Sequence, residues 1–321
     1  MLNSKKKDLL IVHLGSLGDF VITLPAIMML RDMHRKVDIM CQDHHGKLAV
    51  ALGLVDTWFP SDRACFASLY SDKVHPEMKD IFLSHRKILL FSFSDQLRQS
   101  IEDVTGGHVY HIPPRPEAHK RIHVSQHLMD RLEECGMVKE HDRNLANFQS
   151  PLNATKKIGC QRKILIHPGS GSKRKRWPID NFFRLEDMLR ARGLCSEFLI
   201  GPAEHDIEGI IRNQYGHRIR IHETGDLLGL LSLLKSVHGY IGNDSGVTHL
   251  SAFIGIPTLA IFGPSDPVRW RPSGRKVEIV RPALECTPCF ETEQENCDTP
   301  DCLHKTSSEI VLDAFLGLFR Q

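Results

Sequence analysis

The sequence predicts an α/β protein of two doubly wound, Rossmann-like domains, each with its own parallel sheet. Three observations support this fold class. Short apolar runs, typical of buried strands, alternate with amphipathic helical runs through both halves of the chain. Polar, glycine-rich stretches follow several of these runs, as expected where ligands bind at the carboxyl ends of parallel strands. The chain has 321 residues, more than one hydrophobic core usually supports.

The amino-terminal half contains four strand-like runs separated by helical runs, a pattern that implies parallel pairing through right-handed crossovers. The pattern lapses between Lys139 and Arg162 into polar residues that include Pro151 and Asn153, so we expect a domain boundary there. We predict a first domain over residues 1–155. Its expected strands are 9–14, 37–41, 88–93 and 109–112, and its expected helices are 20–31, 45–51 and 96–104.

The carboxyl-terminal half repeats this organisation, so we predict a second domain over residues 156–305. We expect the last segment, 306–321, to form an amphipathic helix that packs back on the first domain. Two similar halves suggest that a ligand is held in a cleft between them. The expected strands are 163–167, 197–200, 218–221, 237–241 and 258–262, and the expected helices are 181–192, one after Glu204, 227–237 and 307–319.

Composition excludes several classes of protein. The formal net charge of +2 argues against a nucleic-acid binder with a broad basic face. No apolar run approaches the roughly 20 residues that span a bilayer. The first apolar run is too short for a secretory signal, and five scattered cysteines suit a reducing compartment. We therefore expect a cytoplasmic monomer, in contact at most with the inner face of the membrane.

The most informative motif lies between the strand-like runs 237–241 and 258–262. It reads Gly242-Asn243-Asp244-Ser245-Gly246 and opens a helix. A helix amino terminus at the carboxyl end of a strand presents free N–H groups and a positive dipole, so this motif predicts a phosphate-binding loop. The alternative is simple helix capping, because Asp, Asn, Ser and Gly are also the usual residues there.

A second motif, Gly15-Ser16-Leu17-Gly18-Asp19, follows the first strand and opens the first helix. It is not the G-x-G-x-x-G fingerprint, so a dinucleotide site is not predicted. Asp19 has two interpretations that its position leaves open. The carboxylate can accept a proton from a substrate hydroxyl, or it can stabilise the helix dipole by about 0.3–1 kcal/mol.

A third loop, from His167 to Pro178, combines small residues with a run of cations that includes Lys175. Backbone amides and cations together suit phosphate, although the order of residues is not that of a Walker A loop. A solvated charge run is the alternative. Glu204, after another strand, is placed to bond the hydroxyls of a ribose, and a helix-terminal charge is the simpler account.

Four cysteines lie close together near the end of the chain: Cys286, Cys289, Cys297 and Cys302. Four thiols in so short a stretch are able to hold a structural zinc, although the second pair departs from the usual spacing. Packing cysteines or a redox-sensitive loop are the alternatives. We expect no catalytic metal there, because thiolates would fill all four positions.

These motifs together resemble glycosyltransferase family 9, the ADP-heptose:lipopolysaccharide heptosyltransferases. The resemblance covers nearly the whole chain, in order. It rests on Leu9–Asp19 with Leu24-Pro25-Ala26, on Ile166–Ser170 with Lys175-Arg176-Trp177-Pro178, and on Gly242–Leu250. It implies the GT-B architecture, with acceptor on the first domain, nucleotide sugar on the second, and inversion at the anomeric carbon without an obligatory metal.

The resemblance also implies roles for individual residues. Asp19 matches the general base, and Lys175 matches a lysine that contacts the donor diphosphate. Glu204 matches a residue that bonds the ribose. The remaining donor-binding residues that we expect on this basis are Ser170, Asp244, Ser245, Gly246 and His249.

The acceptor side departs from the family pattern, because segment 113–123 cannot be matched residue by residue. We expect acceptor contacts from Ser16, Gly18, Lys120 and Arg121. This basic segment suits an anionic acceptor such as a Kdo-bearing lipid A core, and a solvated loop is the alternative. Three other functions stay open: transfer from another nucleotide sugar, epimerisation of a nucleotide sugar, and binding of a nucleotide sugar without catalysis.

Overall fold

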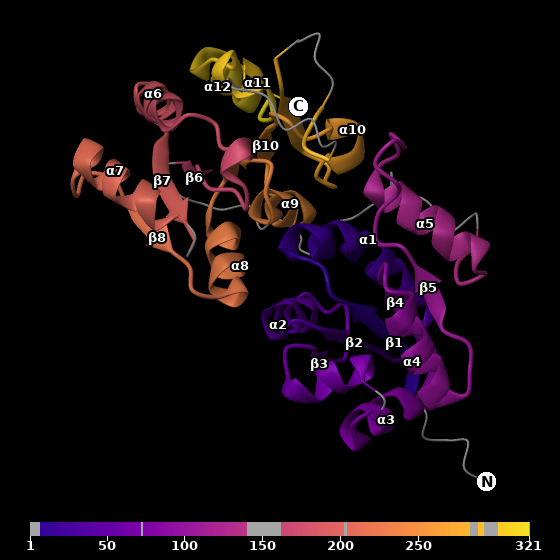
Figure 1. The fold of residues 1–321 in the computed structure, drawn as a ribbon. Helices are drawn as coiled ribbons and strands as arrows, with labels where there is room; N and C mark the ends of the chain where they lie inside the picture. Colours follow the sequence, from indigo (N-terminus) through magenta and orange to yellow (C-terminus); the bar gives the residue numbers. More distant parts are fainter. Residues whose placement is uncertain are drawn as a thin grey trace. The chain divides into compact units, whose positions relative to one another are not determined.

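The computed structural model describes residues 7–71, 73–139, 162–201, 204–282, 288–291 and 301–320 (Figure 1). The chain divides into two compact units, residues 1–147 and 148–321. This division and the boundary expected at residue 155 both fall outside the described residues. No helix in the described part of the chain is long and apolar enough to cross a membrane.

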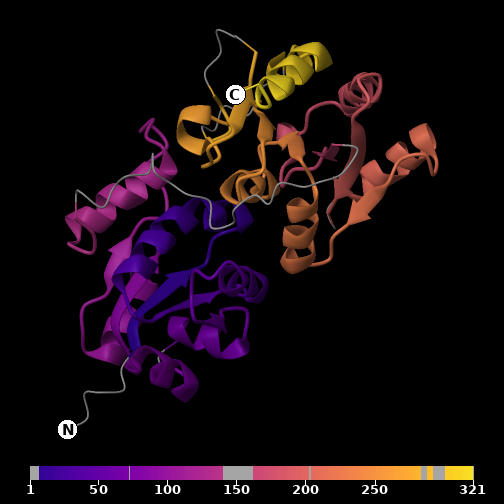
Figure 2. The same cartoon turned by 180° about the vertical axis from the view of Figure 1, so that it is seen from behind.

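The first unit contains a five-stranded parallel sheet with the order β3-β2-β1-β4-β5. This is the order of a doubly wound fold. Strands β2 and β3 are added on one side of β1 and strands β4 and β5 on the other, so the strand order reverses between β1 and β4. Residues Leu9 to Val12 of the central strand β1 are fully buried, because helices cover both faces of the sheet (Figures 1 and 2). The strands are β1 (Lys7–His13), β2 (Val37–Cys41), β3 (Thr57–Pro60), β4 (His85–Phe91) and β5 (Tyr110–Ile112).

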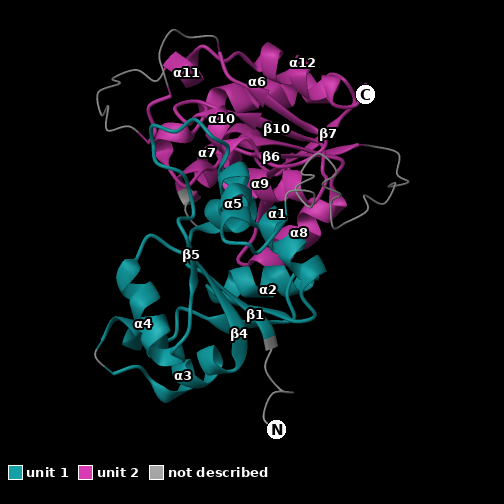
Figure 3. Ribbon diagram, turned by 90° about the vertical axis from the view of Figure 1, so that its right-hand side faces the viewer, with its two compact units in different colours: residues 1–147 teal, residues 148–321 magenta. Residues whose placement is uncertain are grey.

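Helices α1, α2 and α5 lie on one face of this sheet, and α3 and α4 lie on the other (Figure 3). Leu10 and Val12 of β1 point to the second face and join a core with Phe82 of α3 and Leu97 of α4. The helices are α1 (Leu17–Met33), α2 (Asp43–Ala51), α3 (Pro76–Leu83), α4 (Asp95–Thr105) and α5 (Val124–Glu134), with a 3₁₀ segment η1 (Ala64–Tyr70).

The second unit contains a six-stranded parallel sheet with the order β11-β10-β9-β6-β7-β8. Read from β8, it repeats the order of the first unit with one strand more, so its reversal lies between β6 and β9. The strands are β6 (Lys163–His167), β7 (Cys195–Ile200), β8 (Ile221–Glu223), β9 (Gly239–Asn243), β10 (Thr258–Ile261) and β11 (Val277–Val280).

Helices α6 and α12 share one face of this sheet, and α8 and α9 lie on the other (Figure 1). Val311 and Phe315 of α12 belong to the core of the second unit, against β10, β11 and α6. The final helix thus packs on its own unit, and its packing on the first domain stays a prediction. The helices are α6 (Ile179–Arg190), α7 (His205–Tyr215), α8 (Leu227–Ser236), α9 (Gly246–Phe253), α10 (Pro267–Trp270), α11 (Asp301–His304) and α12 (Ser308–Gly317), with a 3₁₀ turn η4 (Lys173–Lys175).

Two edge strands were not expected from the sequence. All four residues of β3 are only partly buried, and it ends in Pro60, which an edge strand tolerates. In β11 only Val277 and Val280 are buried. Such strands lack the continuous apolar run by which the central strands were recognised. Helices α3 and α5 were not predicted either.

Candidate functional site

Apart from Glu204, the basic segment and the cysteine cluster, the predicted site residues lie directly after the carboxyl ends of the strands at which the strand order of each sheet reverses. In the first unit this is the loop after β1, which carries Asp19. In the second unit it is the pair of loops after β6 and β9, two strands that are hydrogen-bonded neighbours. In open parallel sheets ligands bind at this position, so each unit has a candidate site where the fold predicts one.

Asp19 lies in the first turn of α1 and is partly exposed. Its Oδ2 atom accepts two hydrogen bonds from Ser16, one from the main-chain N–H at 3.2 Å and one from the hydroxyl at 2.7 Å. Asp19 is therefore part of a capping box, and the capping interpretation is present in the structure. The same bonds hold one oxygen in place and leave the other carboxylate oxygen as a proton acceptor.

His13, the last residue of β1, is buried beneath this loop and hydrogen-bonded to it. Its Nδ1 accepts a hydrogen bond from Gly15 N–H at 3.3 Å, so Nε2 carries the ring proton and faces the Thr23 hydroxyl at 3.4 Å. That hydroxyl donates to the Asp19 carbonyl at 2.8 Å. Burial lowers the pKa of His13 to about 4, so the ring is neutral. Gly15 is required, because a Cβ there would lie 2.7 Å from Asp19 Cβ and 2.8 Å from the His13 ring.

A second buried histidine, His45 of α2, stacks on Phe20 with ring centroids 4.7 Å apart. It is fully buried, and neither ring nitrogen has a hydrogen-bond partner among the described residues. Burial, followed by the charges of His44 and His13, lowers the pKa of His45 to about 3. The folded protein therefore holds this ring neutral, whereas in the unfolded chain it titrates near 6.5.

This difference predicts acid sensitivity in the first unit. Between about pH 3 and 6.5 the unfolded chain binds more protons than the folded one, so stability is full above pH 6.5 and falls with pH. His45→Phe keeps the stacked ring, cannot be protonated and removes a buried N–H that lacks an acceptor. We expect it to raise the free energy of unfolding by about 1–3 kcal/mol at pH 7, and by more at pH 4.5.

The free energy of unfolding is measured in urea at pH 4.5 and 7.5. Hydrogen exchange of the β1 and β2 amides then shows whether the change lies in the first unit. The matched control is His44→Phe, since His44 is the exposed neighbour of His45. If the stabilisation by His45→Phe were the same at both pH values, His45 would not be the group that titrates.

The second unit brings Lys175 and Asp244 together, although they are 69 residues apart. Lys175 Nζ donates to Asp244 Oδ2 at 2.8 Å, and His249 Nε2 lies 3.5 Å from Oδ1 of the same carboxylate. The Asp244 side chain is 5% exposed and that of Lys175 is 19% exposed. A cation and a histidine thus hold a buried carboxylate just before α9.

Burial alone raises the pKa of Asp244, but the hydrogen bond from His249 and the charge of Lys175 more than offset it. The net pKa lies well below the ordinary range of an aspartate, so the carboxylate stays ionised. An ionised group of this kind does not serve as a proton donor near neutral pH. It can orient Lys175 and His249 and accept hydrogen bonds from hydroxyl groups.

Ser245 is the N-cap of α9, and its hydroxyl accepts a hydrogen bond from Thr248 N–H at 3.3 Å. Capping is therefore confirmed here, and the first-turn N–H groups, beginning at Gly246, remain directed at the carboxyl end of β9. A buried chain of polar contacts continues below the cap. Thr248 Oγ1 lies 3.1 Å from the Tyr240 hydroxyl, which lies 3.0 Å from His167 Nδ1.

Asn243 joins the two loops of this site. Its amide donates to the Pro168 carbonyl at 2.8 Å, and its Oδ1 accepts from Trp177 N–H at 3.0 Å. Ser170 adds a third link, because its hydroxyl donates to the Asp244 carbonyl at 2.8 Å. Ser170, which we predicted to bind the nucleotide-sugar donor, is thus buried and hydrogen-bonded to the neighbouring loop. These bonds fix the positions of the cation-bearing loop and the α9 amino terminus relative to one another.

Glu204 is buried at the carboxyl end of β7, next to the same loops. Its Oε2 accepts from Gly201 N–H at 2.6 Å, and Arg176 approaches Oε1 to 3.8 Å. Burial raises its pKa, but the His167 ring, whose Nε2 lies 3.9 Å from Oε2, and these other contacts bring the net pKa below its usual value. Gly169 is required beside it, because a Cβ at Gly169 would lie 2.4 Å from Glu204 Cδ.

Besides Glu186 Oε2 on α6, two buried polar atoms in the second unit have no hydrogen-bond partner among the described residues, His249 Nδ1 and Ser265 Oγ. Buried polar atoms are normally satisfied by protein or by a ligand. His249 Nε2 faces Asp244, so Nδ1 is the ring nitrogen left for a ligand. Ser265 follows β10, the neighbour of β9, and the sequence analysis did not single it out. Both atoms fit a polar, hydroxyl-bearing ligand.

The basic segment that was predicted to contact an acceptor forms local ion pairs. Lys120 Nζ lies 3.5 Å from Glu117, and His119 Nε2 lies 3.4 Å from the same carboxylate. Lys120 and Arg121 are both exposed. These contacts support the solvated-loop interpretation, and the acceptor role stays a prediction.

The cysteine cluster falls partly outside the described residues, which include Cys289 and Cys302 but not Cys286 and Cys297. Within the described ranges, no group of three or more His, Cys, Asp or Glu side chains is arranged to hold a metal. The zinc site stays a prediction.

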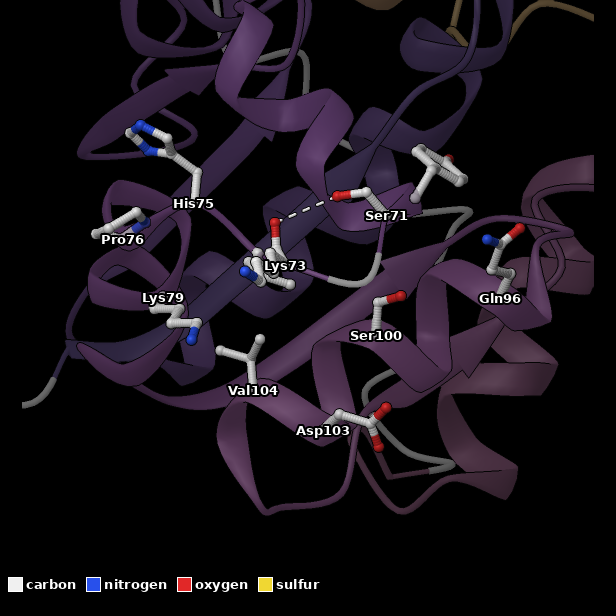
Figure 4. A pocket seen from close by; sticks show the side chains of 11 residues that line it. Ser71, Lys73, His75, Pro76, Lys79, Gln96, Ser100, Asp103 and Val104 are labelled. Carbon is white, nitrogen blue, oxygen red and sulfur yellow. Dashed lines mark hydrogen bonds between the residues drawn. The ribbon is translucent and has the colours of Figure 1, made fainter.

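A pocket of about 960 Å³ lies in the first unit between the chain segment 70–79 and α4 (Figure 4). Its walls include Lys73, Lys79, Ser100 and Asp103, and the Ser71 hydroxyl donates to the Lys73 carbonyl at 3.2 Å. None of the predicted site residues lines it. Its charges are mixed and its lysines exposed, so it gives no specific ligand chemistry.

The two candidate sites also contain residues that were not predicted from the sequence: His13 and Thr23 in the first unit, and Tyr240, Thr248 and Ser265 in the second. Most of them are buried polar residues inside apolar runs, such as His13 at the end of β1. For His13 the signal is a polar residue at the last position of a buried strand, because burying it requires a partner.

Comparison with known proteins supports the predicted family. Residues 126–298, just over half of the chain, match the model of glycosyltransferase family 9 (heptosyltransferase). Lipooligosaccharide heptosyltransferase 2 of Campylobacter jejuni is 27% identical over 202 residues, covering 57% of this chain and 60% of that protein. The matched stretches span only 32% to 60% of the lengths of the curated relatives.

Solved structures match over nearly the whole chain. The glycosyl transferase family 9 protein of Veillonella parvula has a TM-score of 0.76 at 18% identity, covering 98% of this chain and 97% of that one. E. coli ADP-heptose LPS heptosyltransferase II has a TM-score of 0.73 at 15% identity, covering 98% and 99%. At these identities the likeness establishes the fold, and the predicted GT-B fold class with two Rossmann-like domains is confirmed.

Proposed function

This chain belongs to glycosyltransferase family 9, and we propose on that premise that it transfers a heptose from ADP-heptose to a lipopolysaccharide inner-core acceptor or a related glycan. Several relatives are named as lipopolysaccharide or lipooligosaccharide heptosyltransferases, among them that of C. jejuni. The E. coli protein with the same fold is named for ADP-heptose. These names supply the donor and acceptor of the proposal, and the geometry below supports it.

The observation that carries the proposal is the Lys175–Asp244 pair at the amino terminus of α9. When a glycosyl bond to a nucleoside diphosphate breaks, negative charge develops on the leaving diphosphate. A fixed cation and a helix amino terminus stabilise such charge without a metal. The 2.8 Å contact with Asp244 holds Lys175 beside that helix end, so both elements act at one place.

We assign the other donor contacts to the same group of loops. Gly246 and the cap Ser245 present N–H and hydroxyl groups to phosphate, and Ser170 holds the loop that carries Lys175. We assign Asp244 and His249 to the sugar, where the unpartnered Nδ1 of His249 is placed to form a hydrogen bond with a hydroxyl group. Glu204 binds the ribose, because its ionised carboxylate readily accepts hydrogen bonds from the ribose hydroxyls.

Asp19 is proposed as the general base of an inverting transfer. The acceptor hydroxyl oxygen forms a bond to the anomeric carbon as the bond from that carbon to the diphosphate oxygen breaks, and ADP leaves. The hydroxyl proton passes to the Asp19 oxygen that Ser16 does not hold. The two hydrogen bonds from Ser16 orient the carboxylate for this step. Ser16 and Gly18, with Lys120 and Arg121, are proposed to contact an anionic acceptor.

The proposal requires no metal in catalysis, because Lys175 and α9 supply the positive charge. A structural zinc held by Cys286, Cys289, Cys297 and Cys302 is compatible with it, and the metal content of the purified protein tests that site. We propose a cytoplasmic, monomeric enzyme whose acceptor brings it to the inner membrane surface.

The donor half of the proposal is tested by thermal shift with ADP-, UDP- and GDP-linked sugars. A ligand that binds only the folded state stabilises it by about 2.7 kcal/mol at a concentration 100 times its Kd. We expect the ADP-linked sugar to raise the Tm most. No shift with any of the three would contradict the donor site, and a larger shift with a UDP- or GDP-linked sugar would replace ADP-heptose as the donor.

A further inference from the structure

A short part of the cysteine-rich stretch, residues 288–291, lies against the cations of the predicted diphosphate loop. The Lys175 ammonium lies 4.0 Å from the centroid of the Phe290 ring. The Arg174 guanidinium carbon lies 5.9 Å from the same ring, and its Nη2 lies 3.8 Å from Cys289 Sγ. Residues more than 100 positions apart thus meet at the cation that binds diphosphate in our proposal.

Strong polar contacts fix this segment to the body of the second unit. The N–H groups of Cys289 and Phe290 both donate to the Pro264 carbonyl, at 2.9 and 3.0 Å. The Glu291 carboxylate accepts from Arg269 Nε at 2.6 Å and from Trp270 Nε1 at 2.9 Å.

The Arg269 side chain is only 2% exposed, and its Nη2 also donates to Glu291, at 3.2 Å. A buried guanidinium that donates to a carboxylate through two nitrogens fixes the orientation of that carboxylate. Phe290, between Cys289 and Glu291, is therefore held in place from both sides.

The contact leaves Lys175 suited to a phosphate. An ammonium has three N–H donors, of which one bonds Asp244. The ring face attracts the cation and keeps water from one side of it. With one N–H group on Asp244 and one side of the ammonium against the ring, an N–H group remains to donate a hydrogen bond to a diphosphate oxygen.

We propose that Phe290 is a positioning residue for the donor diphosphate, acting through a cation–π contact with Lys175, and that the Arg269–Glu291 pair holds its ring there. This assigns a role in donor binding to the cysteine-rich stretch that is independent of any metal. The proposal rests on the proposed function for the identity of the ligand, but the contact itself exists without ligand.

The first experiment measures the contact in the ligand-free protein. The reactivity of Lys175 toward an acylating reagent is followed by mass spectrometry in Phe290→Leu, Phe290→Tyr and Glu291→Gln. We expect faster labelling of Lys175 in Phe290→Leu and in Glu291→Gln, and the wild-type rate in Phe290→Tyr, which keeps the ring. Lys173, exposed in the same loop, serves as the internal reference.

The second experiment measures ADP affinity by calorimetry in the full chain. Phe290→Leu should weaken ADP binding about three- to tenfold, as expected for loss of a partly buried cation–π contact, and Phe290→Tyr should not. The matched control is Phe319→Leu, which removes a different cation–π contact in the same unit, with Arg162 at 5.2 Å. That variant should bind ADP as the wild type does.

The outcomes separate this inference from the proposed function. If Lys175 labelling is unchanged in Phe290→Leu, or if Phe290→Tyr behaves like Phe290→Leu, the positioning role is overturned. An unchanged rate in Glu291→Gln overturns the role of the Arg269–Glu291 pair. If the wild type does not bind ADP, the donor assignment of the proposed function fails, and the labelling rates still decide whether Phe290 positions Lys175.

Discussion

Replacing Asp19 with Asn is expected to lower kcat by about 10²- to 10⁴-fold, the range found when a general base is removed. Asparagine keeps the size of the side chain and still accepts the hydrogen bonds that Ser16 donates, so the start of α1 should persist. Its amide does not take up the proton of the acceptor hydroxyl. The measurement is the turnover number at saturating donor and acceptor, with donor affinity determined separately by calorimetry.

The control for this variant is Asp95→Asn. Asp95 also lies in the first turn of a helix of the first unit, and its side chain is 82% exposed. The Asp95→Asn substitution removes the same charge without altering the loop after β1. We therefore expect its activity to stay near that of the wild type. Substantial turnover by Asp19→Asn would restrict Asp19 to its role in the capping box.

Replacing Lys175 with Met is expected to weaken ADP binding about 10- to 100-fold, the equivalent of one or two lost hydrogen bonds to a charged group. It should also lower the stability of the second unit, because Asp244 loses the cation that balances its buried charge. The full cost of breaking a buried ion pair is about 3–5 kcal/mol. His249 beside Asp244 and the partial exposure of Lys175 reduce it, so we expect about 1–3 kcal/mol.

The stability loss in Lys175→Met has a predictable pH dependence. The folded-state pKa of Asp244 lies below its ordinary value, so its contribution is present above about pH 4 and disappears as pH falls. Lys175 is one cause of that depressed pKa, and the difference between variant and wild type should therefore shrink as pH is lowered. Urea unfolding across this range measures it. A difference that grows toward low pH would contradict the assignment.

Lys173→Met is the matched control for Lys175→Met. Lys173 occupies the same 3₁₀ turn, is exposed and carries the same charge. If the two variants weakened ADP binding equally, the general positive charge of the loop would explain the effect, and the specific contact between Lys175 and diphosphate would not.

The fold was largely predictable because its central strands are buried on both faces. Residues 9–12, for instance, form an unbroken apolar run that periodicity detects. The edge strands β3 and β11 were not predicted because they are short and only partly buried. The placement of α12 was also not predictable, because an apolar face shows that a helix packs but not on which sheet.

The candidate site was predictable to the level of loops. The rule that ligands bind at the carboxyl ends of parallel strands identified the loops that carry Asp19, Lys175 and Asp244. The pairing of Lys175 with Asp244 was not predicted, and neither was the position of Phe290 over Lys175. Such contacts depend on the path of irregular loops, which no periodicity in the sequence encodes.

The most direct test of the account is acceptor-dependent transfer. The purified protein is incubated with ADP-heptose, with and without a Kdo-bearing lipid A acceptor, while ADP release and acceptor mass are followed and the anomeric configuration of the product is read by NMR. The account predicts ADP release only with acceptor, a gain of one heptose and an inverted anomeric centre. Donor binding without transfer, retention of configuration, or epimerisation of the donor in the absence of acceptor would contradict it.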